Sequence, residues 1–206
     1  MAIACMVMGS SGSGKSASLR NFTKDEVTVI NVAGKPLPFK TDIKTIKTDD
    51  YTTVLARLVE AKTKAIVIDD AQYLMANEFM RRSDEKGFQK FTDIGKNFWN
   101  LVNNVSLMNE NQIVYFLQHT ELDANGDEKA KTIGKLLDEK ITLEGLFSIV
   151  LKAQVSDGRY VFQTQTNGTD TAKSPMGMFE TKEIDNDLKL VDNAIRNFYD
   201  LKGATK

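Results

Sequence analysis

A glycine- and serine-rich stretch, GSSGSGKS at residues 9–16, sets strong limits on the fold of this 206-residue chain. It fits the pattern G-x-x-x-x-G-K-[ST] without a gap and directly follows an apolar run, Ile3 to Met8. Glycines let the backbone turn back on itself, so that its N–H groups point inward and form a nest for phosphate oxygens. A flexible Gly/Ser linker would not carry a lysine in this register between two buried elements. The pattern therefore predicts a phosphate-binding loop between a strand and a helix.

Each part of this loop has an expected role in holding a nucleoside triphosphate such as ATP. The Lys15 ammonium is expected to reach the β- and γ-phosphates, and the Ser16 hydroxyl is expected to bind Mg²⁺. A helix expected at Lys15 to Phe22 would direct its N-terminal N–H groups at the phosphates. The expected nucleotide-binding residues are Gly9, Ser10, Ser11, Gly12, Ser13, Gly14, Lys15, Ser16 and Ala17.

An acidic pair follows another buried run, in the segment KAIVIDDAQ. Asp69 is expected to hold Mg²⁺ through water from the end of its strand, and so to complete the metal site with Ser16. Asp70, one residue later, is placed to polarise a water that attacks the γ-phosphate. The alternative is that the two aspartates begin a loop and cap the next helix.

A third polar strand end, in QIVYFLQHT, is expected to face the same crevice, because ligands bind at the carboxyl ends of strands in open α/β sheets. Gln118, His119 or Thr120 could therefore contact the γ-phosphate, and Gln118 is our choice, since its uncharged side chain both donates and accepts hydrogen bonds. His119 has no second His or Cys at ligand spacing, which is more typical of a plain loop residue. The sequence indicates no catalytic metal besides Mg²⁺.

Short apolar runs recur along the chain and predict a mainly parallel sheet. The first four are almost continuously apolar, as expected for strands covered by helices on both faces. The last two are joined by Ser156-Asp157-Gly158, which predicts an antiparallel hairpin. The predicted strands are Ile3 to Met8, Val27 to Val32, Ala65 to Ile68, Ile113 to Leu117, Ile149 to Val155 and Tyr160 to Thr164.

Helices are predicted between these strands. Apolar residues recur every three or four positions in Phe88 to Met108, and Asp49 or Asp50 can cap a helix over Tyr51 to Lys62. The tail NDLKLVDNAIRNFYDLKG predicts a last helix that stops near Gly203. The whole pattern predicts one α/β domain over residues 1–206.

Composition excludes several function classes. The net charge of −1 provides no global basic field for nucleic acid, so any DNA contact has to be local. The single cysteine, Cys5, allows no disulfide within the chain, which favours a reducing compartment. The apolar start is too short for a membrane span and has no basic region before it, so we expect a cytoplasmic protein without membrane contact.

The segments GSSGSGKS, AIVIDD, FLQH and FQTQTNGTDTAKSPMGMF together resemble the phage-encoded RecA-like P-loop ATPases, which include single-strand annealing proteins. The resemblance covers nearly the whole chain. It implies a RecA-like P-loop NTPase fold, ATP hydrolysis, a role in phage recombination or replication and a location in the host cytoplasm. It also implies homo-oligomeric rings or filaments with ATP at subunit boundaries, where a neighbour's cation completes the site. Lys173 is placed like such a catalytic finger, with Lys182 or Arg159 as substitutes.

The family also binds single-stranded DNA through two loops, whose counterparts here would be Met75 to Lys90 and Glu121 to Gly134. Both are mixed in charge, so solvated loops and DNA contact are equally open readings. Phe79 and Phe88 could stack on bases. The candidate DNA-binding cations are Arg81, Arg82, Lys86 and Lys90.

The sequence departs from RecA at the strand that follows the phosphate loop. RecA has a catalytic glutamate there, whereas this chain reads INVAGKPLPF, so Asp70 has to serve as the base. A DNA-stimulated ATPase is the first functional hypothesis. A helicase-loader-like assembly factor that acts on a protein partner is the second. A small-molecule P-loop kinase is the third, although such kinases usually clamp phosphates with several arginines.

Overall fold

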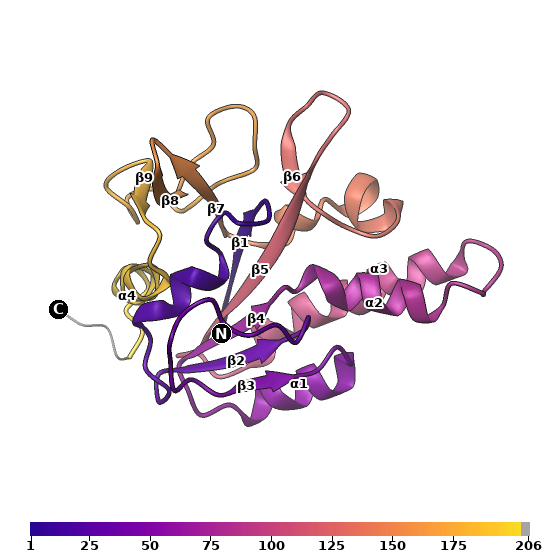
Figure 1. Cartoon of the computed structure of the whole chain (residues 1–206), viewed down its shortest axis with the longest axis horizontal. Coiled ribbons are helices and arrows are strands. Elements are labelled where there is room, and N and C mark those ends of the chain that lie inside the picture. The colour runs from indigo at the N-terminus through magenta and orange to yellow at the C-terminus, as the bar shows by residue number, and fades with distance from the viewer. Residues whose placement is uncertain (203–206) are drawn as a thin grey trace.

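Nine strands form one sheet in the computed structural model, which describes residues 1–202 (Figure 1). Their order across the sheet is β3-β2-β4-β5-β1-β7-β8-β9, and β6 pairs with β5 outside this path. The strands are β1 (Ile3–Gly9), β2 (Val27–Asn31), β3 (Thr45–Lys47), β4 (Ala65–Asp69), β5 (Ile113–Leu122), β6 (Glu128–Ala130), β7 (Ile149–Ser156), β8 (Arg159–Gln163) and β9 (Glu183–Asp185).

The first part of the sheet is parallel, as the continuous apolar runs predict. β3, β2, β4, β5, β1 and β7 all pair in parallel, and β8 and β9 follow as antiparallel strands. Asp157 and Gly158 both have positive φ at the turn between β7 and β8, which matches the tight hairpin expected from Asp-Gly. The structure therefore confirms an α/β fold with a mostly parallel sheet and a C-terminal antiparallel hairpin.

Helices cover both faces of the sheet (Figure 1). The helical segments are η1 (Ser16–Asn21), α1 (Tyr51–Glu60), α2 (Gln72–Arg81), α3 (Gln89–Asn104), η2 (Val105–Leu107), η3 (Leu136–Ile141), η4 (Leu143–Leu146) and α4 (Leu188–Phe198). α1, α2 and α3 bury apolar side chains on one face, whereas η1 and α4 cover the other. Among residues 1–202, no helix combines the length and the apolar composition needed to cross a bilayer.

Side-chain spacing explains how α3 packs on the sheet, and an N-cap explains where α1 begins. Ile94, Phe98 and Leu101 lie on one stripe of α3 and are fully buried, and the Phe98 ring packs edge-on against Phe116 of β5. α1 begins where the Asp50 carboxylate accepts a hydrogen bond of 2.8 Å from the Thr53 N–H, as expected for an N-cap.

Four expectations about local structure are corrected. The segment after the phosphate loop is a six-residue 3₁₀-helix, η1, instead of an α-helix over Lys15 to Phe22. Most of the expected loop Met75 to Lys90 is helical, because α2 runs to Arg81 and α3 begins at Gln89. The expected loop Glu121 to Gly134 contains the end of β5 and the short antiparallel strand β6. α4 ends at Phe198, and Gly203 lies outside the described residues.

The sequence did not indicate α2, or the short strands β3, β6 and β9. Each of these strands has only three residues, too few to show a periodic pattern. They are stabilised by pairing with longer neighbours, so tertiary structure determines them.

Candidate phosphate-binding site

A cleft of about 350 Å³ opens at the carboxyl ends of the central parallel strands. The register places Gly9 of β1 beside His119 of β5, and Asn31 of β2 beside Asp69 of β4, so the polar strand ends meet at one edge. The cleft is lined by Ser11, Gly12, Gly14, Lys15, Ser16, Ala17, Lys35, Pro36, Pro38, Asp69, Asp70, His119 and Tyr160.

The glycines of the loop occupy positions that other residues would not tolerate. Gly14 has φ +93°, and a Cβ there would lie 2.8 Å from the ring of Tyr160. A Cβ on Gly9 would lie 2.5 Å from the carbonyl oxygen of Ala153 in β7. The loop therefore packs closely against β7 and β8 at Gly9 and Gly14, where a larger residue would clash.

Lys15 lies inside the loop. Its ammonium donates hydrogen bonds to the carbonyl oxygens of Gly9 (2.7 Å) and Ser10 (2.8 Å), and the residue is only 6% exposed. Burial lowers the pKa of Lys15 to about 8, although the charges of Asp70 and Asp69 act in the opposite direction. A buried cation beside the cleft is therefore available to an anionic ligand.

Ser16 and Asp69 come together as expected for the two protein ligands of a magnesium site. The Ser16 hydroxyl donates a hydrogen bond of 2.8 Å to Oδ1 of Asp69. Asp69 is 6% exposed, and burial raises the pKa of its carboxyl group. Residues 1–202 contain no cluster of three or more His, Cys, Asp or Glu side chains that could hold a metal. This pair fits Mg²⁺ that keeps water and phosphate oxygens as its remaining ligands.

Asp70 begins the turn after β4 with a left-handed backbone at φ 60°, an unusual conformation for a residue other than glycine. Its carboxylate contacts two side chains, with Oδ2 at 3.1 Å from Nζ of Lys35 and Oδ1 at 3.1 Å from Nε2 of His119. Burial alone would raise the pKa of Asp70, but hydrogen bonds with His119 and Lys35 hold it below its ordinary value. Asp70 is therefore a paired, ionised carboxylate at the cleft.

The sequence reasoning missed the contribution of the segment after β2. Asn31 accepts a hydrogen bond of 2.7 Å from the Gly34 N–H and donates one of 2.5 Å to the Lys35 carbonyl oxygen. These bonds fix a turn that brings Lys35, Pro36 and Pro38 to the cleft. The sequence contained one signal for this segment. β2 is predicted as a strand of a parallel sheet, so the residues that follow it should lie at the same edge as those that follow β1 and β4.

Our choice of Gln118 over His119 is not supported by the geometry. Gln118 is fully buried on the face that also carries Phe116, and its amide donates a hydrogen bond of 2.7 Å to the carbonyl oxygen of Lys131. His119 points to the other face and lines the cleft. The reason is the two-residue period of a strand, which places neighbouring side chains on opposite faces.

Lys173 does not line the cleft of its own chain. Its backbone N–H and carbonyl group pair with those of Val150 in β7 at 2.8 Å, so this part of the Gly168 to Gly177 segment is pinned to the sheet. Arg159 directly precedes the cleft residue Tyr160, and the carbonyl of Lys182 accepts a hydrogen bond from the Thr164 N–H. The expected contact of Lys173 with a neighbouring subunit stays a prediction.

Three of the four candidate DNA-binding cations already have partners. Arg81 donates to Asp49 at 2.6 Å, and Arg82 forms ion pairs with carboxylates of Glu78, Glu85 and Asp93. Lys90 is 8% exposed and donates to backbone carbonyls at the end of α2.

Lys86 is exposed, and it lies in the connection between α2 and α3 together with Phe88, which is 87% exposed. Phe79 packs against Phe91 instead. DNA contact therefore stays a prediction, with Lys86 and Phe88 as its most accessible parts.

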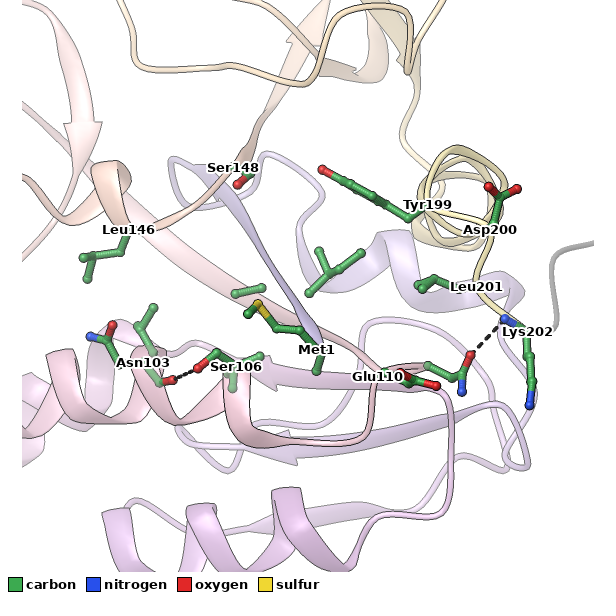
Figure 2. Close-up of a pocket in the computed structure, with 16 residues that line it drawn as sticks. Met1, Asn103, Ser106, Glu110, Leu146, Ser148, Tyr199, Asp200, Leu201 and Lys202 are labelled. Carbon is green, nitrogen blue, oxygen red and sulfur yellow. Dashed lines mark hydrogen bonds between the residues drawn. The ribbon is translucent and has the colours of Figure 1, made fainter.

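A larger cavity, of about 660 Å³, lies at the opposite ends of the strands (Figure 2). Met1 and Ile3 line it at the start of β1, and Tyr199 extends into it from the end of α4 toward Ser148. It contains none of the predicted phosphate-binding residues. The predicted phosphate-binding residues that line a cavity therefore do so at the smaller cleft, where the polar strand ends converge.

No protein-family model matches the chain, and no curated protein has significant sequence similarity to it. The functional argument therefore depends on the residues and their geometry.

Proposed function

We propose that this chain is a P-loop NTPase of RecA-like type that binds Mg·ATP in the 350 Å³ cleft and hydrolyses it. The observation that carries the proposal is the hydrogen bond between Ser16 and Asp69, 2.8 Å long, which joins positions 53 residues apart. It unites a glycine-rich loop and an acidic strand end, the two halves of a site for a metal-bound phosphate. The glycine-rich loop alone, or the acidic strand end alone, would not distinguish an NTPase from another kind of phosphate-binding protein.

The residues of the site then divide into distinct roles. The loop amides and Lys15 would hold the phosphates. Ser16 and Asp69 would hold Mg²⁺, which would neutralise part of the phosphate charge. Asp70 would accept a proton from the attacking water as the water oxygen bonds to the γ-phosphorus and the bond from phosphorus to the leaving ADP oxygen breaks. The products of this step are ADP and inorganic phosphate.

The resemblance to phage RecA-like ATPases supports the wider proposal of an oligomer that acts on single-stranded DNA in recombination or replication. The alternative is an assembly factor that uses the same ATP site on a protein partner. Arg82 is ion-paired and Lys90 is buried, which leaves few accessible cations near α2. These contacts weaken the case for DNA binding at α2 and so favour the alternative. The small-molecule kinase has no specific support from the geometry.

The ATP site is tested by calorimetric titration with ATP in the presence of Mg²⁺ or of a chelator. Lys15→Ala should abolish binding, and Asp69→Asn should remove the part of the affinity that depends on Mg²⁺. Lys62→Ala removes an exposed positive charge and is the matched control for Lys15→Ala. Asp42→Asn removes an exposed negative charge and is the matched control for Asp69→Asn. Wild-type protein that ignores ATP would refute the proposal, and so would a Lys15→Ala variant that binds normally.

The partner is tested by the ATPase rate with and without single-stranded DNA at two salt concentrations. Stimulation that fades with salt is expected if DNA phosphates are bound, because binding then releases counterions. A full oligomer formed with ATP alone, and a rate indifferent to DNA, would instead favour the assembly factor. Mixed Lys173→Ala and wild-type subunits should lose activity more than in proportion if the lysine acts on a neighbour.

A further inference from the structure

Lys35 is a second cation at the phosphate cleft, and nothing in the loop motif assigns it a role. We propose that Lys35 binds the γ-phosphate of the nucleotide within its own subunit, and that it exchanges Asp70 for the phosphate when a triphosphate is bound. The inference rests on the proposed function, because it concerns the substrate of the same site.

The contacts of Lys35 show a fixed backbone and a reachable side chain. Its carbonyl oxygen accepts a hydrogen bond from Asn31, and the preceding Gly34 is held by the same asparagine, so the turn is anchored to the end of β2. The side chain is 63% exposed and extends to Asp70 at 3.1 Å and over the Tyr73 ring, 5.1 Å from its centroid. The ammonium can therefore move while the loop stays in place.

Lys35 and Lys15 act on the same small volume. Both line the cleft, and the charge of Lys35 contributes to the lowered pKa of Lys15. Two cations that repel one another across a cleft favour an anion between them. The β- and γ-phosphates of a triphosphate would place negative charge between these two cations. The terminal β-phosphate of a diphosphate would be bound by the loop and Lys15 alone.

The ion pair with Asp70 is weak enough to exchange. An ion pair with one partner mostly in solvent contributes little to stability, whereas a phosphate offers a multiply charged acceptor. Asp70 would keep its contact with His119 when Lys35 leaves, so its carboxylate would remain oriented with one side free for water. The exchange would therefore couple recognition of the third phosphate to release of the proposed base.

The test is the ratio of affinities for Mg·ATPγS and Mg·ADP, measured by calorimetry in Lys35→Met. We expect the affinity for Mg·ATPγS to fall by roughly tenfold to a hundredfold, as for loss of a charge-assisted hydrogen bond, and the affinity for Mg·ADP to change by less than about twofold. Lys40→Met is the matched control, because it removes an exposed lysine from the same connection without a cleft contact and should leave both affinities unchanged. Thermal melts check that both variants fold.

Each outcome has a separate meaning. Wild-type protein that binds neither nucleotide would overturn the proposed function and this inference together. If the wild type prefers Mg·ATPγS and Lys35→Met keeps that preference, Lys35 has no γ-phosphate contact, while the ATP site stands. An equal loss of affinity for both nucleotides in Lys35→Met would also overturn the inference, because Lys35 would then contribute only to the overall electrostatic potential of the cleft.

Discussion

Replacing Lys15 with methionine should change how the stability of the nucleotide-free protein depends on pH. The chain holds this ammonium at 6% exposure, and its pKa falls from an ordinary value of 10.5 to about 8. The shift corresponds to a cost of roughly 3 kcal/mol for keeping the charged form in the folded state. Methionine has a similar length and no charge, so the variant lacks this cost.

The sign follows from proton linkage. Below about pH 8, Lys15 is protonated in both the folded and the unfolded protein, and the cost of burying the charge is fully present. Between about pH 8 and 10.5 the folded protein releases the proton while the unfolded chain keeps it, so the cost is relieved as the pH rises. From about pH 7 to about pH 9.5, the wild type should gain about 2 kcal/mol of unfolding free energy relative to Lys15→Met.

Urea unfolding at the two pH values, with both proteins free of nucleotide, measures this difference. Lys62→Met is the control, because it removes a lysine charge from an exposed position outside the cleft. Parallel profiles for the wild type and Lys15→Met would refute the reasoning. The lysine would then not be buried at a cost inside the phosphate loop.

Three further predictions concern the core and the loop. Asp192→Asn should destabilise the protein by about 3–5 kcal/mol in urea unfolding, because the buried Arg196 guanidinium loses its countercharge. Arg196 is 2% exposed and lies 2.6 Å from Asp192. A loss under about 1 kcal/mol would contradict a buried ion pair. The Cys5 thiol is fully buried, and burial raises its pKa. It should therefore react with a thiol-specific disulfide reagent only at the rate of unfolding. Rapid labelling of the native protein would show that β1 is accessible to the reagent. Gly14→Ala should abolish ATP binding in calorimetry and lower the melting temperature, because Gly14 has a φ of +93° and an added Cβ would lie 2.8 Å from the Tyr160 ring. Normal binding would show that the loop adapts.

The loop and the acidic strand end could be recognised because their chemistry is encoded locally. Gly9 to Ser16 form one continuous motif, and Asp69 directly follows a buried apolar run. Six strands were predictable for the same reason, since each is an apolar run of sufficient length. The choice between Gln118 and His119 is different, because it depends on which face of β5 borders the cleft. The residues of that strand alternate between two faces, and both faces are covered, so the strand's own sequence does not say which one meets the ligand.

The sequence by itself determined that this chain is an α/β protein with a glycine-rich loop, an acidic strand end and a late hairpin, because runs, periods and motifs act over neighbouring residues. Only the tertiary structure decided that Lys35 and His119 hold Asp70 and that Arg82 and Lys90 are already engaged. Those contacts join residues from different strands and loops. Their existence depends on strand order, register and the side of the sheet, which no short segment of sequence specifies.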